Sequence, residues 1–400
     1  MKVICFLFDP NVGGPTIRAR AVYEILTSPS QTDPLQVQVV FPRNDGPALS
    51  YIQDAGLPAR RLQVDKPVLP RKLAPFLRFA ASSPVALWRL WRFLRRERPD
   101  VIHVNGAFDV LPAIAGRLAG VAVVWHLNDT IFGSRLSQIL GWFVNLTADV
   151  VIVAAERVGQ HYGIPQDRWT VVHAPVDVGR FPARDLSSLP SASPRLTLIG
   201  NWNWIKGQDR FVDVITGLRS ENLRVTGQII GRFLDGQEDF WKPICDRIRV
   251  ENLTDVIDTP GFIADTPGIL ANTDLLLLTS HSEASPIAVL EAMAVGVPVV
   301  AFDVGGVREQ LGVPSGDGSQ HSGAAGIVVP AGDVNAMIDA CRTVLSNSTL
   351  WHRLARNGQR RARDHFSLET CAARHVKAYE KALSSHSGRP NRNSRKIGQL

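Results

Sequence analysis

Short runs of consecutive apolar residues alternate along the chain with longer stretches in which apolar residues recur every three or four positions. Short runs between turn residues are typical of buried strands, and the longer pattern is typical of helices. In the first half, strands are predicted at residues 2–8, 36–41, 101–104, 121–126, 150–153 and 170–173. In the second half, they are predicted at 195–199, 223–230, 256–258, 274–279, 298–302 and 327–329. The alternation predicts an α/β protein with two parallel, doubly wound sheets.

A segment without apolar periodicity separates the two halves. Residues 177–194 are rich in Pro, Ser and Ala and are predicted to be a linker. Domains are therefore expected at 1–176 and 195–366, each Rossmann-like, followed by a helix at 367–383. Residues 384–400 lack an apolar pattern and are expected to form a disordered basic tail. Two such halves imply a cleft, with ligands outside the carboxyl ends of the strands.

Composition narrows the class of protein. Of 400 residues, 45% are hydrophobic and 20% charged, which indicates a globular chain. No run of 18 uncharged apolar residues occurs, so no spanning helix is expected, and residues 1–8 are predicted to be a buried strand, not a signal peptide. Four widely spaced cysteines argue for a reducing compartment and against structural zinc. A cytoplasmic protein is expected.

The net charge of +7 is concentrated in two segments. Residues 71–98 hold eight Lys and Arg against the single acid Glu97, and the tail holds four more basic residues. Within Leu87–Glu97, a helical projection puts Arg89, Arg92 and Arg96 on one stripe with Phe93 among them, and Leu87, Trp91 and Leu94 opposite. The apolar stripe is expected to pack on the first sheet. The basic face is expected to meet an anionic membrane surface, and no nucleic-acid motif accompanies it.

The strongest chemical signal is the segment Glu283–Pro298. Ser285 is predicted to be the N-cap and Pro286 the first residue of a helix that Gly296 ends. The amides at such a helix start attract anions, and the carboxylates of Glu283 and Glu291 can accept hydrogen bonds from sugar and ribose hydroxyls.

A second glycine-containing turn follows the first predicted strand. Gly13 and Gly14 would let backbone amides approach a phosphate or a sugar closely. The chain has neither a GxGxxG fingerprint at this turn nor a GxxxxGK[ST] motif, so a dinucleotide fold of that type and a P-loop ATPase are excluded.

Taken in order, several segments together resemble glycosyltransferase family 4, the retaining GT-B enzymes also called glycosyl transferases group 1. The segments that carry the resemblance are Asn11–Pro15, Pro99–His103, Val123–His126, Ala148–Ala154, Val171–Asp177, Leu198–Gly207, Glu283–Pro298, Gly305–Glu309 and Gly326–Asp333. The resemblance implies a GT-B fold, with two Rossmann-like domains facing across a cleft and the helix 367–383 crossing back to the first. It also implies a glycosyltransferase of the hexosyltransferase type.

The resemblance also implies site residues. Lys206 would bind the donor diphosphate, and His126 and Glu283 would act with it in catalysis. Further donor contacts would come from Gly13, Gly14, Asn201, Ile263, Pro286, Ile287, Ala288 and Glu291. His103 and Asn105 would line the acceptor side. Asn201 stands where the family carries an Arg, and Arg18 or Arg232 could supply the missing charge. No metal and no cofactor are expected.

The expected reaction moves a sugar, with retention, from a UDP- or GDP-sugar to a hydroxyl of a glycan or lipid-linked glycan. Such a reaction belongs to cell-envelope polysaccharide or glycolipid synthesis, at the inner face of the cell membrane. One alternative is a GT-B nucleotide-sugar 2-epimerase, against which the set Lys206, Glu283 and Glu291 argues. The other is a non-catalytic nucleotide-sugar-binding protein with a decayed donor site, which Asn201 favours.

Overall fold

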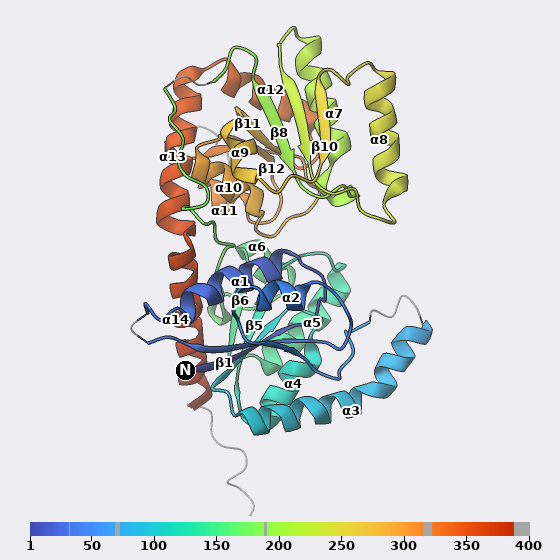
Figure 1. Ribbon diagram of the computed structural model, residues 1–400, viewed down its shortest axis with the longest axis vertical. Helices are drawn as coiled ribbons and strands as arrows, with labels where there is room; N and C mark the ends of the chain where they lie inside the picture. Colours follow the sequence, from blue (N-terminus) through green and yellow to red (C-terminus); the bar gives the residue numbers. More distant parts are fainter. Residues whose placement is uncertain (32, 69–72, 188–189, 315–321, 388–400) are drawn as a thin grey trace, which may run out of the picture. The chain divides into compact units, whose positions relative to one another are not determined.

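The computed structural model describes residues 1–31, 33–68, 73–187, 190–314 and 322–387 (Figure 1). The chain forms two compact units. The first comprises Met1–Ala154, Val158–Val172 and the chain from Ala372 on; the second comprises Ala155–Arg157 and His173–Cys371.

The first unit is built on a seven-stranded parallel sheet with the strand order β3-β2-β1-β4-β5-β6-β7. Its strands are β1 (Lys2–Leu7), β2 (Gln36–Phe41), β3 (Ala59–Arg61), β4 (Val101–Asn105), β5 (Ala122–Leu127), β6 (Val150–Val153) and β7 (Trp169–Val171). All residues of β4, β5 and β6 are buried, which matches their unbroken apolar runs. The six predicted strands are confirmed, and β3 is additional. It was missed because its sequence, Ala-Arg-Arg, has no apolar run.

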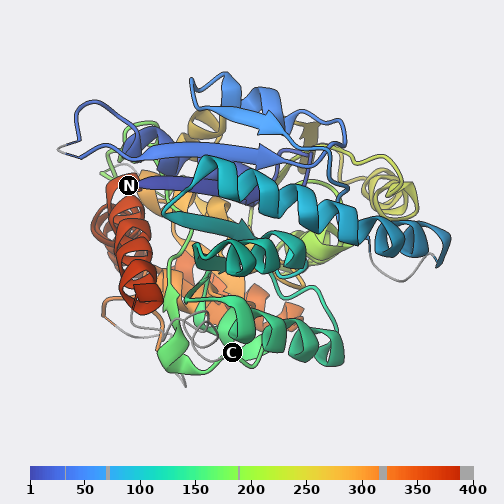
Figure 2. The same cartoon turned by 90° about the horizontal axis from the view of Figure 1, so that it is seen from below.

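Helices connect these strands in the first unit. They are α1 (Gly14–Leu26), α2 (Ala48–Gln53), α3 (Leu73–Glu97), α4 (Val110–Ala119), α5 (Ser134–Thr147) and α6 (Glu156–His161), with a 3₁₀ turn at Gln166–Arg168. Figure 2 shows α3, α4 and α5, coloured from blue through teal to green, side by side on one face of the sheet. Their outer surfaces form one layer, which we call the three-helix face.

Two expectations about the basic helix are wrong. Phe93 is buried and does not project among the arginines, because the Arg60 guanidinium lies 4.2 Å from its ring centroid and covers it. Trp91 is 37% exposed and does not pack inward. The buried residues in this part of α3 are Ala86, Leu90, Phe93 and Leu94.

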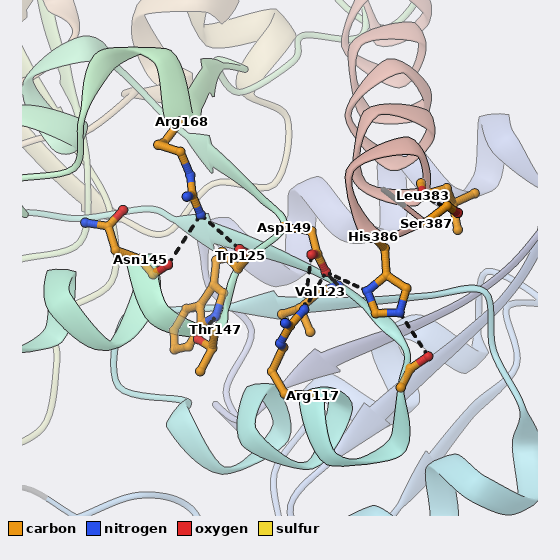
Figure 3. Close-up of polar contacts among 12 residues, drawn as sticks. Arg117, Val123, Trp125, Asn145, Thr147, Asp149, Arg168, Leu383, His386 and Ser387 are labelled. Atoms are coloured by element: carbon orange, nitrogen blue, oxygen red, sulfur yellow. Dashed lines mark hydrogen bonds and ion pairs between the residues drawn. The ribbon is translucent and has the colours of Figure 1, made fainter. Parts of the chain in front are cut away.

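The last helix, α14 (Leu368–Ser387), is part of the first unit from Ala372 on. It extends beyond the predicted 367–383, so residues 384–387 of the expected tail are helical; residues 388–400 lie outside the described part of the chain. Figure 3 shows how its end is held. The buried carboxylate of Asp149 accepts hydrogen bonds from the Val123 amide and the Arg117 guanidinium, and it lies 3.3 Å from Nδ1 of His386.

The second unit has a six-stranded parallel sheet with the order β10-β9-β8-β11-β12-β13. Its strands are β8 (Arg195–Ile199), β9 (Thr226–Ile230), β10 (Ile257–Gly261), β11 (Leu275–Leu278), β12 (Val299–Phe302) and β13 (Gly326–Val329). Its helices are α7 (Gln208–Ser220), α8 (Glu238–Val250), α9 (Thr266–Ala271), α10 (Ile287–Val295), α11 (Val307–Leu311), α12 (Val334–Leu345) and α13 (Ser348–Phe366), with a 3₁₀ turn at Trp204–Lys206. All six strands predicted in this half are confirmed.

The segment predicted as a linker packs on the second unit. The Asp274 carboxylate accepts hydrogen bonds from the Ser191 amide and hydroxyl and from the Arg195 amide. Within the described residues, no helix is both long enough and apolar enough to cross a bilayer.

Candidate functional site

Each sheet contains a point where the strand order reverses. In the first unit, β1 and β4 lie side by side although two strands separate them in sequence, and in the second unit β8 and β11 do the same. The chain leaves such a strand pair in opposite directions, which opens a crevice at the carboxyl ends of the strands. The predicted site residues of each unit gather around these two points.

In the second unit, the loops that follow β8 and β11 bring Lys206 and Glu283 together. Nζ of Lys206 lies 2.6 Å from Oε1 of Glu283, and the Ser280 hydroxyl donates to the same oxygen at 2.8 Å. The Lys206 side chain is 28% exposed and that of Glu283 10%. The pair is therefore reachable from solvent, and the ammonium can meet an anionic ligand while Glu283 holds it in place.

Backbone contacts fix the position of Lys206. The Thr279 hydroxyl donates to the carbonyl of Gly207 at 2.7 Å, and the His281 amide donates to the carbonyl of Ile205. Gly207 has a φ of +64°, and a Cβ there would lie 2.2 Å from the Thr279 carbonyl oxygen. Only glycine fits this position, so the Lys-Gly pair in the sequence has a steric cause.

A second glycine pair, Gly305 and Gly306, packs against the backbone of the loop that carries Glu283. Gly305 has a φ of +51°, and a Cβ there would lie 1.8 Å from the Glu283 carbonyl oxygen. The amide of Gly306 donates to the Ala284 carbonyl at 2.9 Å. The segment Gly305–Glu309, singled out in the sequence, thus packs directly against the loop that carries Glu283.

Helix α10 begins one residue later than predicted. Pro286 is its N-cap, with Ile287 and Ala288 in the first turn. The prediction that Ser285 caps the helix is wrong, because its hydroxyl instead accepts from the Ala174 amide and from Nε2 of Gln310. The first-turn amides have no acceptor within the helix, so the start of α10 retains the positive end of a dipole.

Glu291 lies inside α10, and burial raises the pKa of its carboxyl to about 7; the nearby charge of Arg180 opposes this only in part. A carboxyl with this pKa exists in both protonation states near neutral pH. It can therefore donate or accept a hydrogen bond at little cost.

Asn201 follows β8 and is exposed, and its side-chain oxygen accepts from the amide of Arg232 at 3.2 Å. The Arg232 guanidinium lies 4.2 Å from the ring centroid of Phe262, the residue before Ile263. Of the two arginines considered as substitutes for the missing cation, Arg232 is thus beside Asn201 in the second unit. Arg18 is buried in the first unit, where it donates to the Asn128 side chain.

In the first unit, a pocket of about 620 Å³ opens at the carboxyl ends of β1, β4 and β5. It is lined by the predicted residues Gly13 and Asn105, among others. Gly13 is the N-cap of α1, and Gly14 is the first residue of that helix. A Cβ at Gly14 would meet no atom within 4 Å, so packing does not require glycine there.

His103 and His126 are buried, and each lies two residues before an asparagine that lines the pocket, Asn105 and Asn128 respectively. The ring of His126 is fully buried and stacks on that of His103, with centroids 5.3 Å apart and Nδ1 of His126 3.1 Å from Nε2 of His103. Nδ1 of His103 lies 3.0 Å from the Tyr23 hydroxyl and 2.8 Å from the Tyr379 hydroxyl of α14. Burial lowers the pKa of both histidines well below its usual value, so both rings are neutral.

The pocket also contains residues that the sequence analysis did not single out. Asp109 and Asp129 line it, as do the rings of Phe108 and Phe132. Both carboxyls follow the ends of β4 and β5 within a few residues, so the rule that ligands bind at strand ends could have found them. In the second unit, Thr279 and Ser280 were missed although they directly follow β11.

Comparisons with known proteins match each half of the chain to a glycosyltransferase family model. Residues 31–180 match the family described as Glycosyltransferase Family 4, and residues 193–347 match Glycosyl transferases group 1. The chain is 26% identical to the lipopolysaccharide core biosynthesis mannosyltransferase LpsB of Rhizobium meliloti, over 81% of this chain and 90% of that protein. It is 24% identical to the glycogen synthase of Mycobacterium tuberculosis, over 71% of this chain and 69% of that protein.

Among solved structures, the chain is similar to HepE of Anabaena. The complex of HepE with UDP superposes with a TM-score of 0.78 at 20% identity, covering 95% of this chain and all of that one. The complex with UDP-glucose gives a TM-score of 0.75 at 20% identity, covering 95% of this chain and 99% of that one.

Proposed function

Since the chain belongs to glycosyltransferase family 4 and has the GT-B fold, we propose that it transfers a sugar, with retention, from a nucleotide sugar to a hydroxyl of a glycan or lipid-linked glycan. The second unit would bind the donor and the first the acceptor. The observation that carries the proposal is the ion pair of Lys206 and Glu283 at the point where strand order reverses in the second unit.

The donor would be a UDP- or GDP-sugar, and HepE, which binds UDP and UDP-glucose, supports this class. Lys206 and the first-turn amides of α10 would take the diphosphate, with no metal ion. Glu291 would accept from the ribose, and Asn201 and Ile263 would supply further donor contacts. Arg232 would provide the cation that Asn201 cannot.

In the proposed reaction, the acceptor oxygen bonds to the anomeric carbon on the face from which the diphosphate leaves. The bond from that carbon to the phosphate oxygen breaks, and the leaving phosphate takes the proton of the acceptor hydroxyl. Lys206 stabilises the charge that develops on the phosphate, and no carboxylate nucleophile is needed. Glu283 orients Lys206 and faces the sugar. His126 is enclosed in the core, so we assign it a supporting role behind the loop that follows β5.

A thermal-shift panel of UDP, GDP, ADP and their sugar conjugates tests the donor site. A ligand at a hundredfold excess over its dissociation constant stabilises the protein by about 2.7 kcal/mol. One base should stabilise the chain, and Lys206→Ala and Glu291→Ala should reduce the shift. Lys242→Ala, an exposed lysine of α8, is the matched control. If no nucleotide shifts the transition, the alternative of a decayed donor site replaces this proposal. Release of an epimerised donor without acceptor would favour the 2-epimerase alternative.

The protein would meet its acceptor at the inner face of the cell membrane, with the three-helix face in contact with the lipid. Trp88 of α3 is 53% exposed, Leu118 of α4 61% and Trp142 of α5 60%, and Arg89, Arg92, Arg95 and Arg96 of α3 are exposed as well. Glu97 is the one acid among residues 71–98, and it is paired with Lys2 and Arg60. Exposed aromatic residues with basic neighbours are typical of helices that lie on anionic lipid.

Vesicle flotation tests this surface. The chain should float with phosphatidylglycerol-containing vesicles and not with phosphatidylcholine alone. Because each basic residue near the surface contributes about 1 kcal/mol, Arg92→Glu with Arg96→Glu should weaken binding about tenfold or more. Arg356→Glu, an exposed arginine of the second unit, is the control. Equal flotation with both vesicle types would contradict the proposal.

A further inference from the structure

Most residues that line the pocket of the first unit lie at the ends of β1, β4 and β5 or soon after them, and Asn44 and Lys66–Val68 add a wall that follows β2 and β3. Its position at the point where strand order reverses is where a ligand is expected in this kind of sheet. Its volume of about 620 Å³ lies within the usual range for small-molecule sites. The chemistry of its lining therefore indicates which ligand it takes.

The polar part of this lining consists of carboxyl and amide side chains, with one hydroxyl and one ammonium group among the described residues. Asp9, Asp109 and Asp129 line the pocket together with one basic side chain, that of Lys66. Nζ of Lys66 already lies 3.1 Å from a carboxylate oxygen of Asp9. Among the described residues of the lining, a phosphate or carboxylate group would thus meet more acids than bases, and Lys66 is already paired.

Two of the three carboxyls are held largely away from water. Asp109 is 8% exposed, and burial raises the pKa of its carboxyl well above its usual value, although the Phe8 amide donates to it. Burial also raises the pKa of Asp129, whose carboxyl accepts from the Tyr162 hydroxyl at 3.1 Å. A carboxyl accepts hydrogen bonds from the hydroxyls of a sugar when it is ionised, and it also donates when it is protonated. An incoming anion would raise these pKa values further and would bind less well.

The apolar part of the lining includes a pair of rings. Phe108 and Phe132 lie with centroids 6.0 Å apart at an interplanar angle of 30°. A pyranose ring has an apolar C–H face and a rim of hydroxyls, so it can contact such rings with its face and the carboxyls with its rim.

We infer that this pocket binds an uncharged pyranose ring, the terminal sugar of the acceptor, and selects against phosphorylated or acidic rings. The role as acceptor site rests on the proposed function, whereas the preference for an uncharged ring rests on the pocket alone. It follows that the acceptor ends in a neutral sugar at the position where transfer occurs.

Saturation-transfer NMR without any nucleotide tests this directly. The probes are the methyl glycosides of glucose, mannose, galactose and N-acetylglucosamine, each compared with its 6-phosphate. At least one neutral glycoside should bind, and at least about tenfold more tightly than its phosphate. Asp129→Asn should weaken that glycoside severalfold. Asp9→Asn, at an exposed position, removes the partner of Lys66. The 6-phosphate should then bind better, so the affinity ratio between the neutral glycoside and its 6-phosphate should fall. Asp54 is an exposed acid of the same unit outside the pocket, so Asp54→Asn should change neither the affinity for the glycoside nor that for its 6-phosphate.

The inference would be overturned if the wild-type chain bound a 6-phosphate more tightly than its neutral glycoside. It would also be overturned if none of the four neutral glycosides bound. The outcome is separable from that of the proposed function. If a neutral glycoside binds but no nucleotide does, the pocket stands and the transferase proposal fails. If nucleotides bind and neutral glycosides do not, only the present inference fails.

Discussion

The two units have the same strand order around β1–β4 and β8–β11, and their candidate sites lie at the same edge of each sheet, yet the chemistry of these sites differs. The site of the second unit is an ion pair, Lys206 with Glu283, near a helix start. The site of the first unit is a pocket with carboxyls of raised pKa, beside neutral histidines. Topology thus sets where each candidate site lies, and the residues of the loops set the charge of its lining.

The largest expected effect concerns the charged site. Lys206→Ala should lower the rate of transfer about 10²–10³-fold, because a donor aimed at a developing oxyanion is worth about 3–4 kcal/mol. Steady-state kinetics with the nucleotide sugar found in the binding panel would measure it. Lys242→Ala should leave the rate within about twofold. A rate for Lys206→Ala within tenfold of the wild type would contradict the role of Lys206 in stabilising charge at the site of the second unit.

Glu291 allows the pH dependence of the second unit to be predicted. Its pKa is raised from 4.5 to about 7 on folding, so its contribution to stability is fully present below pH 4.5 and is lost as the pH rises through 7. Relative to Glu291→Gln, the wild type should therefore lose about 3 kcal/mol of unfolding free energy between these values. Urea unfolding of both proteins from pH 4.5 to 8 would measure this. A constant difference across that range would contradict the burial of the carboxylate.

The two glycine-containing turns should respond differently to alanine. At Gly207, a Cβ would meet the Thr279 carbonyl oxygen and the φ is positive, so Gly207→Ala should cost about 2 kcal/mol of stability. At Gly14, a Cβ meets open space, so Gly14→Ala should change stability by less than about 0.5 kcal/mol. Chemical denaturation of the pair gives the comparison directly, and equal costs would refute the steric argument.

The smallest effect is expected in the histidine cluster. Tyr379→Phe removes one of two hydroxyls at Nδ1 of His103 and should cost about 1 kcal/mol, with the Tyr23 hydroxyl retained. Tyr51→Phe, on helix α2 outside the cluster, is the matched control. Equal unfolding free energies of the two variants would show that α14 does not depend on this contact.

The sequence predicted the sheets well because apolar runs report burial on both faces of a parallel strand. It was less reliable where a contact distant in sequence decides the outcome. The Arg60 guanidinium covers the Phe93 ring, and the Ser285 hydroxyl accepts from Ala174 and Gln310 instead of capping its own helix. Periodicity cannot show such partners. The position of Asp109 after β4 could have marked it as a site residue, but only the folded pocket shows that its carboxyl is buried.

Since α14 completes the first unit, that unit is assembled from both ends of the chain. Tyr379 meets Tyr23 and His103, and His386 meets Asp149, only after His173–Cys371 have been made. At synthesis rates of about 5–20 residues per second, the first unit waits roughly 10–40 s on the ribosome for its last helix. Strands β1–β7 of the first unit are synthesised before β8–β13 of the second, but the contacts of α14 form only after both. The first unit is therefore the last to be completed, although its synthesis begins first.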